Sequence, residues 1–244
     1  MTGWVAKRFW GRASVAETAG GWTVQLDDRP LRTPARAPMV LPTRAVAALI
    51  AAEWEAQVGT VNPATMPATR AANAAIDKTR GQRAEVAGLV AAYGATDLLC
   101  YRADQPAALA ARQAAAWDPI LDWAEARYAV AFRRTTGVMP TDQPPATLAR
   151  LEARVAALDP FRLTALHDLV AIPGSLVIGL AAAESAFSLE TLWAAARVDE
   201  EWQIAQWGRD DEAEAAAANR RAAFVQAATF FAACQTGSAN EPQA

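Results

Sequence analysis

The chain has 244 residues, of which 53% are hydrophobic, enough to bury the core of one large domain or of a small domain joined to a larger one. Its 23 basic and 26 acidic residues give a formal charge of −3 and are scattered along the chain, which argues against nucleic acid as a partner. The two cysteines, Cys100 and Cys234, lie far apart in sequence and indicate neither a disulfide framework nor a zinc site.

The apolar segments of the sequence are too short to direct secretion or to cross a membrane. The first residues, Met1 to Arg8, contain no apolar stretch of the kind that a secretory signal needs. The longest uncharged apolar run, Ala171 to Ala183, contains Pro173 and is shorter than the ~20 residues that a membrane-spanning helix requires. We therefore expect a core helix in this run and a cytoplasmic protein.

The first part of the chain has the pattern of a small β-meander. Residues 14–17, 22–26 and 31–33 are short stretches that alternate or are rich in β-branched residues. Turn signals separate them at residues 19–21 and 27–30. The strands are expected to be confined to about the first forty residues, with at most one further short strand near residues 132–136.

A helical period begins at Thr43, a plausible N-cap, and stops near Gly59. Its apolar side is formed by Val46, Leu49, Ile50 and Trp54. At about 100° per residue, Glu53 and Gln57 fall on that same side. These two polar residues are therefore predicted to be buried, hydrogen-bonded and structural, and to tie the helix to the meander.

The rest of the chain repeats the helical spacing and predicts a helical bundle. Apolar residues recur at i, i+3, i+4 and i+7 in several segments. These segments are residues 86–93, 117–124, 148–158, 161–172, 175–183 and 189–231. The last of them is expected to be interrupted or kinked near Gly208.

The sequence offers little that could carry catalysis or bind a metal. The sole histidine, His167, is followed by Asp168, and neighbouring residues of a helix are expected to point in different directions. The phosphate-binding glycine loops and the nucleophile elbow are absent. The acidic runs at residues 27–28 and 210–212 lack the spacing of a calcium loop. We expect no catalytic residue, no metal and no cofactor.

The chain carries a series of motifs that are informative as an ordered set. The motifs are Lys7-Arg8-Phe9-Trp10, Gly21-Trp22, Leu26-Asp27, Arg29-Pro30-Leu31, Leu41-Pro42-Thr43, Glu53-Trp54, Gln57, Met66-Pro67, Thr69-Arg70, Asn73, residues 96–102 (Thr-Asp-Leu-Leu-Cys-Tyr-Arg), Trp117-Asp118-Pro119, Trp123, Asp199-Glu200, Gln203 and Trp207-Gly208. In this order they closely resemble the ATP synthase assembly chaperones that bind the alpha subunit. The resemblance spans roughly residues 7 to 231.

This resemblance implies an α+β fold without enzymatic activity. It implies a small N-terminal mixed α/β domain over residues 1–80, a larger orthogonal helical bundle over residues 81–235, and a polar tail over residues 236–244. The implied function is to bind the free alpha subunit of an F-type ATP synthase and to shield its subunit interface until the beta subunit arrives. Two alternatives stay open: a non-catalytic helical adaptor for another oligomeric complex, and an enzyme that uses buried carboxylates.

The acidic residues after position 198 are the candidate partner contact. Counted at about 100° per residue from Leu189, Glu200 falls inside an apolar stripe, Asp199 lies at its edge and Glu201 points to the polar side. A carboxylate on an apolar face is either paired internally, here to Arg197 or Arg209, or presented to a partner. We hypothesise that Asp199, Glu200 and Trp207 contact the alpha subunit.

Overall fold

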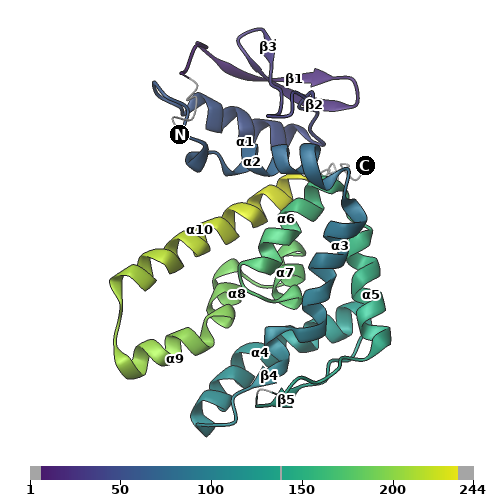
Figure 1. Cartoon of the computed structure of the whole chain (residues 1–244), viewed down its shortest axis with the longest axis vertical. Helices are drawn as coiled ribbons and strands as arrows, with labels where there is room; N and C mark the ends of the chain where they lie inside the picture. Colours follow the sequence, from purple (N-terminus) through teal and green to yellow (C-terminus); the bar gives the residue numbers. More distant parts are fainter. Residues whose placement is uncertain (1–6, 138, 236–244) are drawn as a thin grey trace, which may run out of the picture. The chain divides into compact units, whose positions relative to one another are not determined.

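The computed structural model in Figure 1 describes residues 7–137 and 139–235. The chain divides into two compact units. Of the described residues, unit 1 comprises 7–81, 160–164 and 229–235, and unit 2 comprises 82–137, 139–159 and 165–228. Two helices, α6 (Pro160–Ala171) and α10 (Asp211–Ala233), therefore contribute residues to both units.

Unit 1 contains the predicted meander. The strands β1 (Ala13–Thr18), β2 (Gly21–Leu26) and β3 (Arg29–Pro30) form an antiparallel sheet in that order. The pairing of β1 with β2 runs from Ala13 opposite Leu26 to Thr18 opposite Gly21. Gly21 has a φ of 154°, and a Cβ at this position would collide with the carbonyl oxygen of Leu41, so the start of β2 requires glycine.

Helix α1 (Arg44–Glu55) forms the core of unit 1 together with the sheet. Its N-cap is Thr43, whose hydroxyl oxygen accepts a hydrogen bond from the Val46 backbone at 3.1 Å, as expected from the sequence. At the other end, Glu55 accepts from the Ala13 backbone of β1 at 2.7 Å and pairs with Arg8 at 2.8 Å. These two contacts lower the pKa of the Glu55 carboxyl, the Ala13 hydrogen bond most. Unit 1 continues through η1 (Pro63–Thr65), α2 (Pro67–Ala74) and η2 (Ala75–Thr79).

Unit 2 is formed mainly by helices. They are α3 (Arg83–Ala92), η3 (Tyr93–Thr96), η4 (Leu98–Cys100), α4 (Ala107–Tyr128), α5 (Pro145–Ala156), α7 (Leu176–Ala183), α8 (Leu189–Ala196) and α9 (Val198–Trp207), with most of α6 and α10. Every residue of α7 is buried, which confirms the core helix predicted from the apolar run. The α+β fold class is confirmed, with the sheet first and helices after it.

Two features of unit 2 differ from the expectation. The short strand predicted near residues 132–136 is present as β5 (Thr135–Thr136), but it pairs in parallel with a strand that was not predicted, β4 (Tyr101–Arg102). The interruption predicted near Gly208 is confirmed, because α9 ends at Trp207 and α10 begins at Asp211, whereas the further break at Arg197, between α8 and α9, was not predicted.

A buried carboxylate, Asp97, fixes the start of α7. Its Oδ1 accepts hydrogen bonds from the Ser175 hydroxyl at 2.7 Å and from the Leu99 backbone at 3.1 Å. Its Oδ2 accepts from the Val177 backbone at 3.0 Å. The Ser175 oxygen in turn accepts from the Ile178 backbone as the N-cap of α7. The pKa of the Asp97 carboxyl is raised, because the effect of burial is larger than the opposing effect of the hydrogen bonds from Val177 and Ser175.

We predict that Asp97→Ala destabilises the protein by about 3 kcal/mol or more. The substitution leaves two backbone donors and one hydroxyl without their acceptor in a buried environment. Urea unfolding measures the loss. The matched control is Asp104→Ala, whose side chain is exposed and should change stability by less than about 0.5 kcal/mol. Equal effects of the two substitutions would contradict the role assigned to Asp97.

Candidate functional site in the first turn of helix α9

The break between α8 and α9 brings three carboxylates into one helical turn. Helix α8 ends at Ala196, Arg197 adopts φ −114° and ψ 12°, and α9 begins at Val198. Asp199, Glu200 and Glu201 therefore occupy the first turn of α9, where negative charge is favourable because of the helix dipole. The break also means that the apolar stripe calculated from Leu189 does not continue into α9, so that part of the prediction was wrong.

Arg197 holds two of the three carboxylates. Its side chain is 10% exposed, pairs with Glu200, and lies 3.2 Å from Glu201 Oε1. Its guanidinium also lies over the Trp193 ring, 5.8 Å from the centroid. The internal salt bridge considered for Arg197 is thus present, whereas Arg209 pairs with Glu214 instead, at 2.7 Å. Glu201, which the helical period placed on the polar side, therefore has an internal partner as well.

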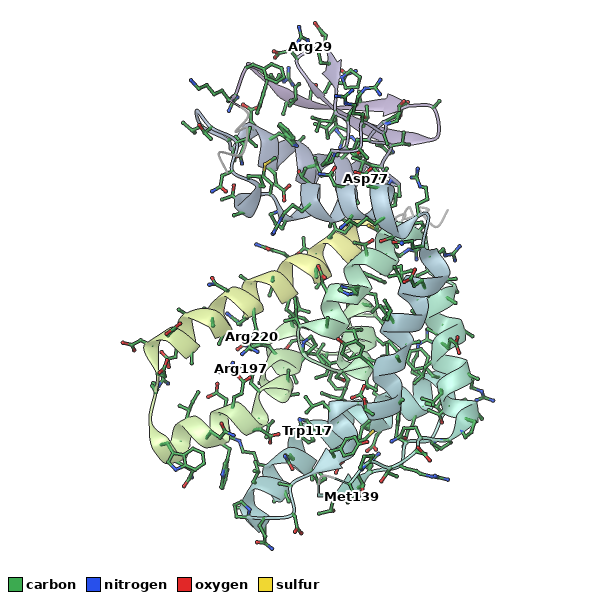
Figure 2. The ribbon with its side chains drawn as sticks, viewed as in Figure 1. Arg29, Asp77, Trp117, Met139, Arg197 and Arg220 are labelled. Carbon is green, nitrogen blue, oxygen red and sulfur yellow. The ribbon has the colours of Figure 1, made fainter. Side chains whose placement is uncertain are left out.

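A second arginine, Arg220, reaches Glu200 from α10. Its Nη2 lies 3.2 Å and 3.3 Å from the two carboxylate oxygens. Figure 2 shows Arg197 and Arg220 close together between α10 and the α8–α9 segment. One residue further along α10, Arg221 pairs with Glu190 of α8. A groove of about 260 Å³ lies between α10 and the α8–α9 segment, and its lining includes Arg197, Glu201 and Arg221 as well as Ile204 and Ala217.

Asp199 is connected to α4 and not to an arginine. Its Oδ1 accepts a hydrogen bond from the Gln113 side chain at 2.6 Å. Gln113 is buried, and its own amide oxygen accepts from the Ala103 backbone at 2.7 Å. The carboxylate therefore has a structural partner on one oxygen and is half-buried.

Trp207 is the large aromatic side chain at the end of the acidic helix. It is the last residue of α9 and is 79% exposed. Gly208 follows it with a φ of 93°, a left-handed conformation that ends the helix. An exposed tryptophan beside charged residues is the composition that protein interfaces use for an anchor with a polar rim.

Glu53 and Gln57 lie in unit 1, apart from this acidic turn in sequence. Gln57 is buried, and its side chain bonds the Glu53 carbonyl, Thr65 and the Asn62 backbone. Glu53 is half-buried and accepts from the backbones of Ala68 and Thr69 at 2.6 Å and 2.8 Å. The prediction that they contact the meander was wrong, since Glu53 caps the start of α2. The acidic residue of α1 that does contact the meander is Glu55, two positions after Glu53, which accepts a hydrogen bond from Ala13 of β1.

The histidine and the acidic run at residues 27–28 each have a local partner. His167 hydrogen-bonds the adjacent Asp168 at 3.0 Å, contrary to the expectation that their side chains diverge, and this contact raises the pKa of the His167 imidazole. Asp27 accepts from the Gly11 and Arg12 backbones. Within residues 7–137 and 139–235, no group of three or more His, Cys, Asp or Glu side chains is placed to hold a metal ion. In the same residues, no helix has the length and apolar character needed to cross a membrane.

Comparison with known proteins identifies close relatives. The family model described as ATP12 chaperone protein matches residues 7–125. The crystal structure of Atp12 from Paracoccus denitrificans shares 49% sequence identity and a TM-score of 0.92, covering 94% of this chain and 99% of that chain. A single-residue mutant of the same Paracoccus protein gives the same identity and TM-score. A proposed chaperone from Agrobacterium tumefaciens shares 41% identity and a TM-score of 0.91, covering 95% of this chain and 87% of that one.

We predict that Glu53→Ala lowers the free energy of unfolding by about 1 to 3 kcal/mol, because the first N–H groups of α2 lose their acceptor. Urea or thermal unfolding gives the value. Glu17→Ala, at an exposed position of β1, is the control and should leave stability nearly unchanged. An unaltered melting temperature for Glu53→Ala would show that the cap contributes nothing.

Proposed function

We propose that this chain, which belongs to the ATP12 family of ATP synthase assembly chaperones, binds the free alpha subunit of an F-type ATP synthase. In this role it shields the subunit interface of the alpha subunit until the beta subunit replaces it, and it acts in the cytoplasm. An unassembled subunit exposes apolar interface area and risks open-ended association. A chaperone that covers this area prevents such association without any catalytic step.

The observation that carries the proposed contact is the exposed Trp207 at the end of the acidic helix. Because Trp207 is 79% exposed, a partner that covers it removes a large apolar area from water, which favours binding. The carboxylates of Asp199 and Glu200, about two turns earlier on the same helix, supply a polar rim that favours a partner carrying basic residues. A small aromatic anchor with a charged rim suits a complex that must later be released.

Trp207→Ala tests this contact without disturbing the core. We expect at least about a tenfold loss of affinity for the alpha subunit, the usual cost of truncating an aromatic anchor. The measurement is co-expression of the two proteins, followed by titration of the soluble complex. The matched control is Leu89→Ala, which removes another large side chain, 60% exposed, from α3 of the same unit. Equal binding by the two variants would exclude Trp207 from the interface.

Charge reversal at Asp199 or Glu200 tests the rim. Asp199→Lys and Glu200→Lys should each weaken binding of the alpha subunit while circular dichroism and the melting temperature show an intact fold. The control is Glu152→Lys at an exposed position of α5. If the reversals at Asp199 and Glu200 unfold the protein, or if they leave binding unchanged, the acids serve the structure alone.

Chaperone activity should need neither a metal nor a nucleotide. We predict that suppression of alpha-subunit aggregation, measured by light scattering, is unchanged by EDTA and by the absence of ATP. The physical reason is that the proposed contact uses only apolar area and ion pairs of the protein itself. Loss of activity on chelation, restored by adding a divalent cation, would contradict this and direct attention to the acidic runs at residues 27–28 and 210–212.

A further inference from the structure

A second groove lies between α4 and α8, on unit 2. Its volume is about 490 Å³, within the range of sites that enclose small apolar ligands or side chains. Alanines form much of its lining, Ala115 and Ala116 from α4 and Ala194 and Ala195 from α8. Ala115 and Ala194 are exposed to solvent, whereas Ala195 is buried at the base. The groove is therefore apolar and open.

A hydrogen bond keeps the two helices in place at this groove. The indole N–H of Trp117 on α4 donates to the Ala195 carbonyl of α8 at 2.7 Å, and both residues are buried. Figure 2 marks Trp117. Because alanine side chains end at Cβ, helices fixed in this way leave space between them that larger residues would fill. The space is thus a consequence of the small side chains at this contact.

The charge at the groove is not balanced. Of the two charged residues in its lining, Glu190 pairs with Arg221 of α10. Arg112 is exposed and has no ion pair or side-chain hydrogen bond among the described residues. Arg112 lies one helical turn before Ala115 and Ala116, on the same side of α4. An occupant that matches the groove therefore presents apolar side chains to the alanines and a carboxylate to Arg112.

The groove lies next to the first turn of α9. Val198 belongs to the groove lining, and the next residue is Asp199. Asp199 is hydrogen-bonded to Gln113, the neighbour of Arg112 on α4. The groove and the proposed contact residues therefore share the α4 and α9 segments that this hydrogen bond joins.

We propose that the α4–α8 groove receives an apolar segment of the alpha subunit that carries an acidic residue, with Arg112 binding the carboxylate. This inference rests on the proposed function and adds a second anchor point to it. The apolar segment fills space that is otherwise occupied by water, and the arginine fixes the orientation of the segment.

The test introduces a large side chain into the groove from a position that is exposed. Ala115→Trp and Ala194→Trp should each weaken alpha-subunit binding at least tenfold with no change in the melting temperature. Ala149→Trp, at an exposed alanine of α5, is the matched control and should bind like the unaltered protein.

At the charged position, Arg112→Glu should weaken binding and Arg112→Lys should retain most of it. Arg44→Glu, at an exposed arginine of α1, is the control for charge reversal.

Cross-linking identifies the segment directly. Both natural cysteines are buried, and burial raises the pKa of the Cys100 thiol to about 12, so a cysteine introduced at Ala115 is the reactive one among the described residues. A photoreactive label on Ala115→Cys should cross-link to an alpha-subunit peptide that contains apolar residues and an Asp or Glu. The same label on Ala149→Cys should give no such product.

The outcomes separate this inference from the proposed function. If the unaltered protein does not bind the alpha subunit, the proposed function fails. If it binds, and the groove variants bind equally well or Ala115→Cys gives no cross-link, the groove assignment alone is overturned. A groove substitution that changes self-association, measured by analytical ultracentrifugation, while alpha-subunit binding stays constant would assign the groove to a second copy of this chain and also overturn the proposal.

Discussion

The hydrogen bonding of one buried carboxylate, Asp97, determines where the central helix of unit 2 begins. An ionised carboxylate is costly to bury unless its oxygens are satisfied, and here the donors are the first turn of α7 and its N-cap Ser175. The acid and the helix it caps are 78 residues apart in sequence. Helix α7 in turn contacts α4 and α8, and both proposed contact surfaces lie on these helices or on α9, which follows α8 directly. The geometry of the candidate site thus depends on a polar contact that lies in the core.

The contacts at the candidate site itself are weaker. Arg220 and Glu200 are each about half exposed, and a surface ion pair of this kind contributes about 1 kcal/mol or less. Between α10 and α8, the buried Phe224 ring lies 6.1 Å from that of Trp193, and Ala217 of α10 is also buried. Glu200 can therefore exchange an internal arginine for a basic residue of a partner at small cost. The pair with Arg220 therefore does not argue against the proposed contact, while the pair with the more buried Arg197 keeps Glu200 in position.

Local patterns predicted the elements whose order depends on near neighbours. The meander, the Thr43 cap and the apolar helix around residues 176–183 follow from alternation, capping chemistry and composition, and all are present. The break at Arg197 was missed because no glycine or proline marks it. Strand β4 was missed because it is two residues long and its partner lies 34 positions later. The partner of Glu53 was missed because a helical period indicates which side a residue faces, and not which distant N–H groups lie there.

The alanine content of the chain illustrates the same limit and its physical cause. In the sequence, alanine indicates only that helix is favoured, since it has the highest helix propensity. In the structure, the alanines at positions 115 and 194, which are 79 residues apart, face one groove because α4 and α8 meet there. A single alanine on a helix surface leaves no enclosed space, but alanines from two helices at one contact leave a space that none of the described side chains fills. Whether a small residue produces a groove or only a bare helix surface is decided by tertiary contacts. A search for binding surfaces in alanine-rich chains therefore has to begin from the pairs of helices that tertiary structure brings together.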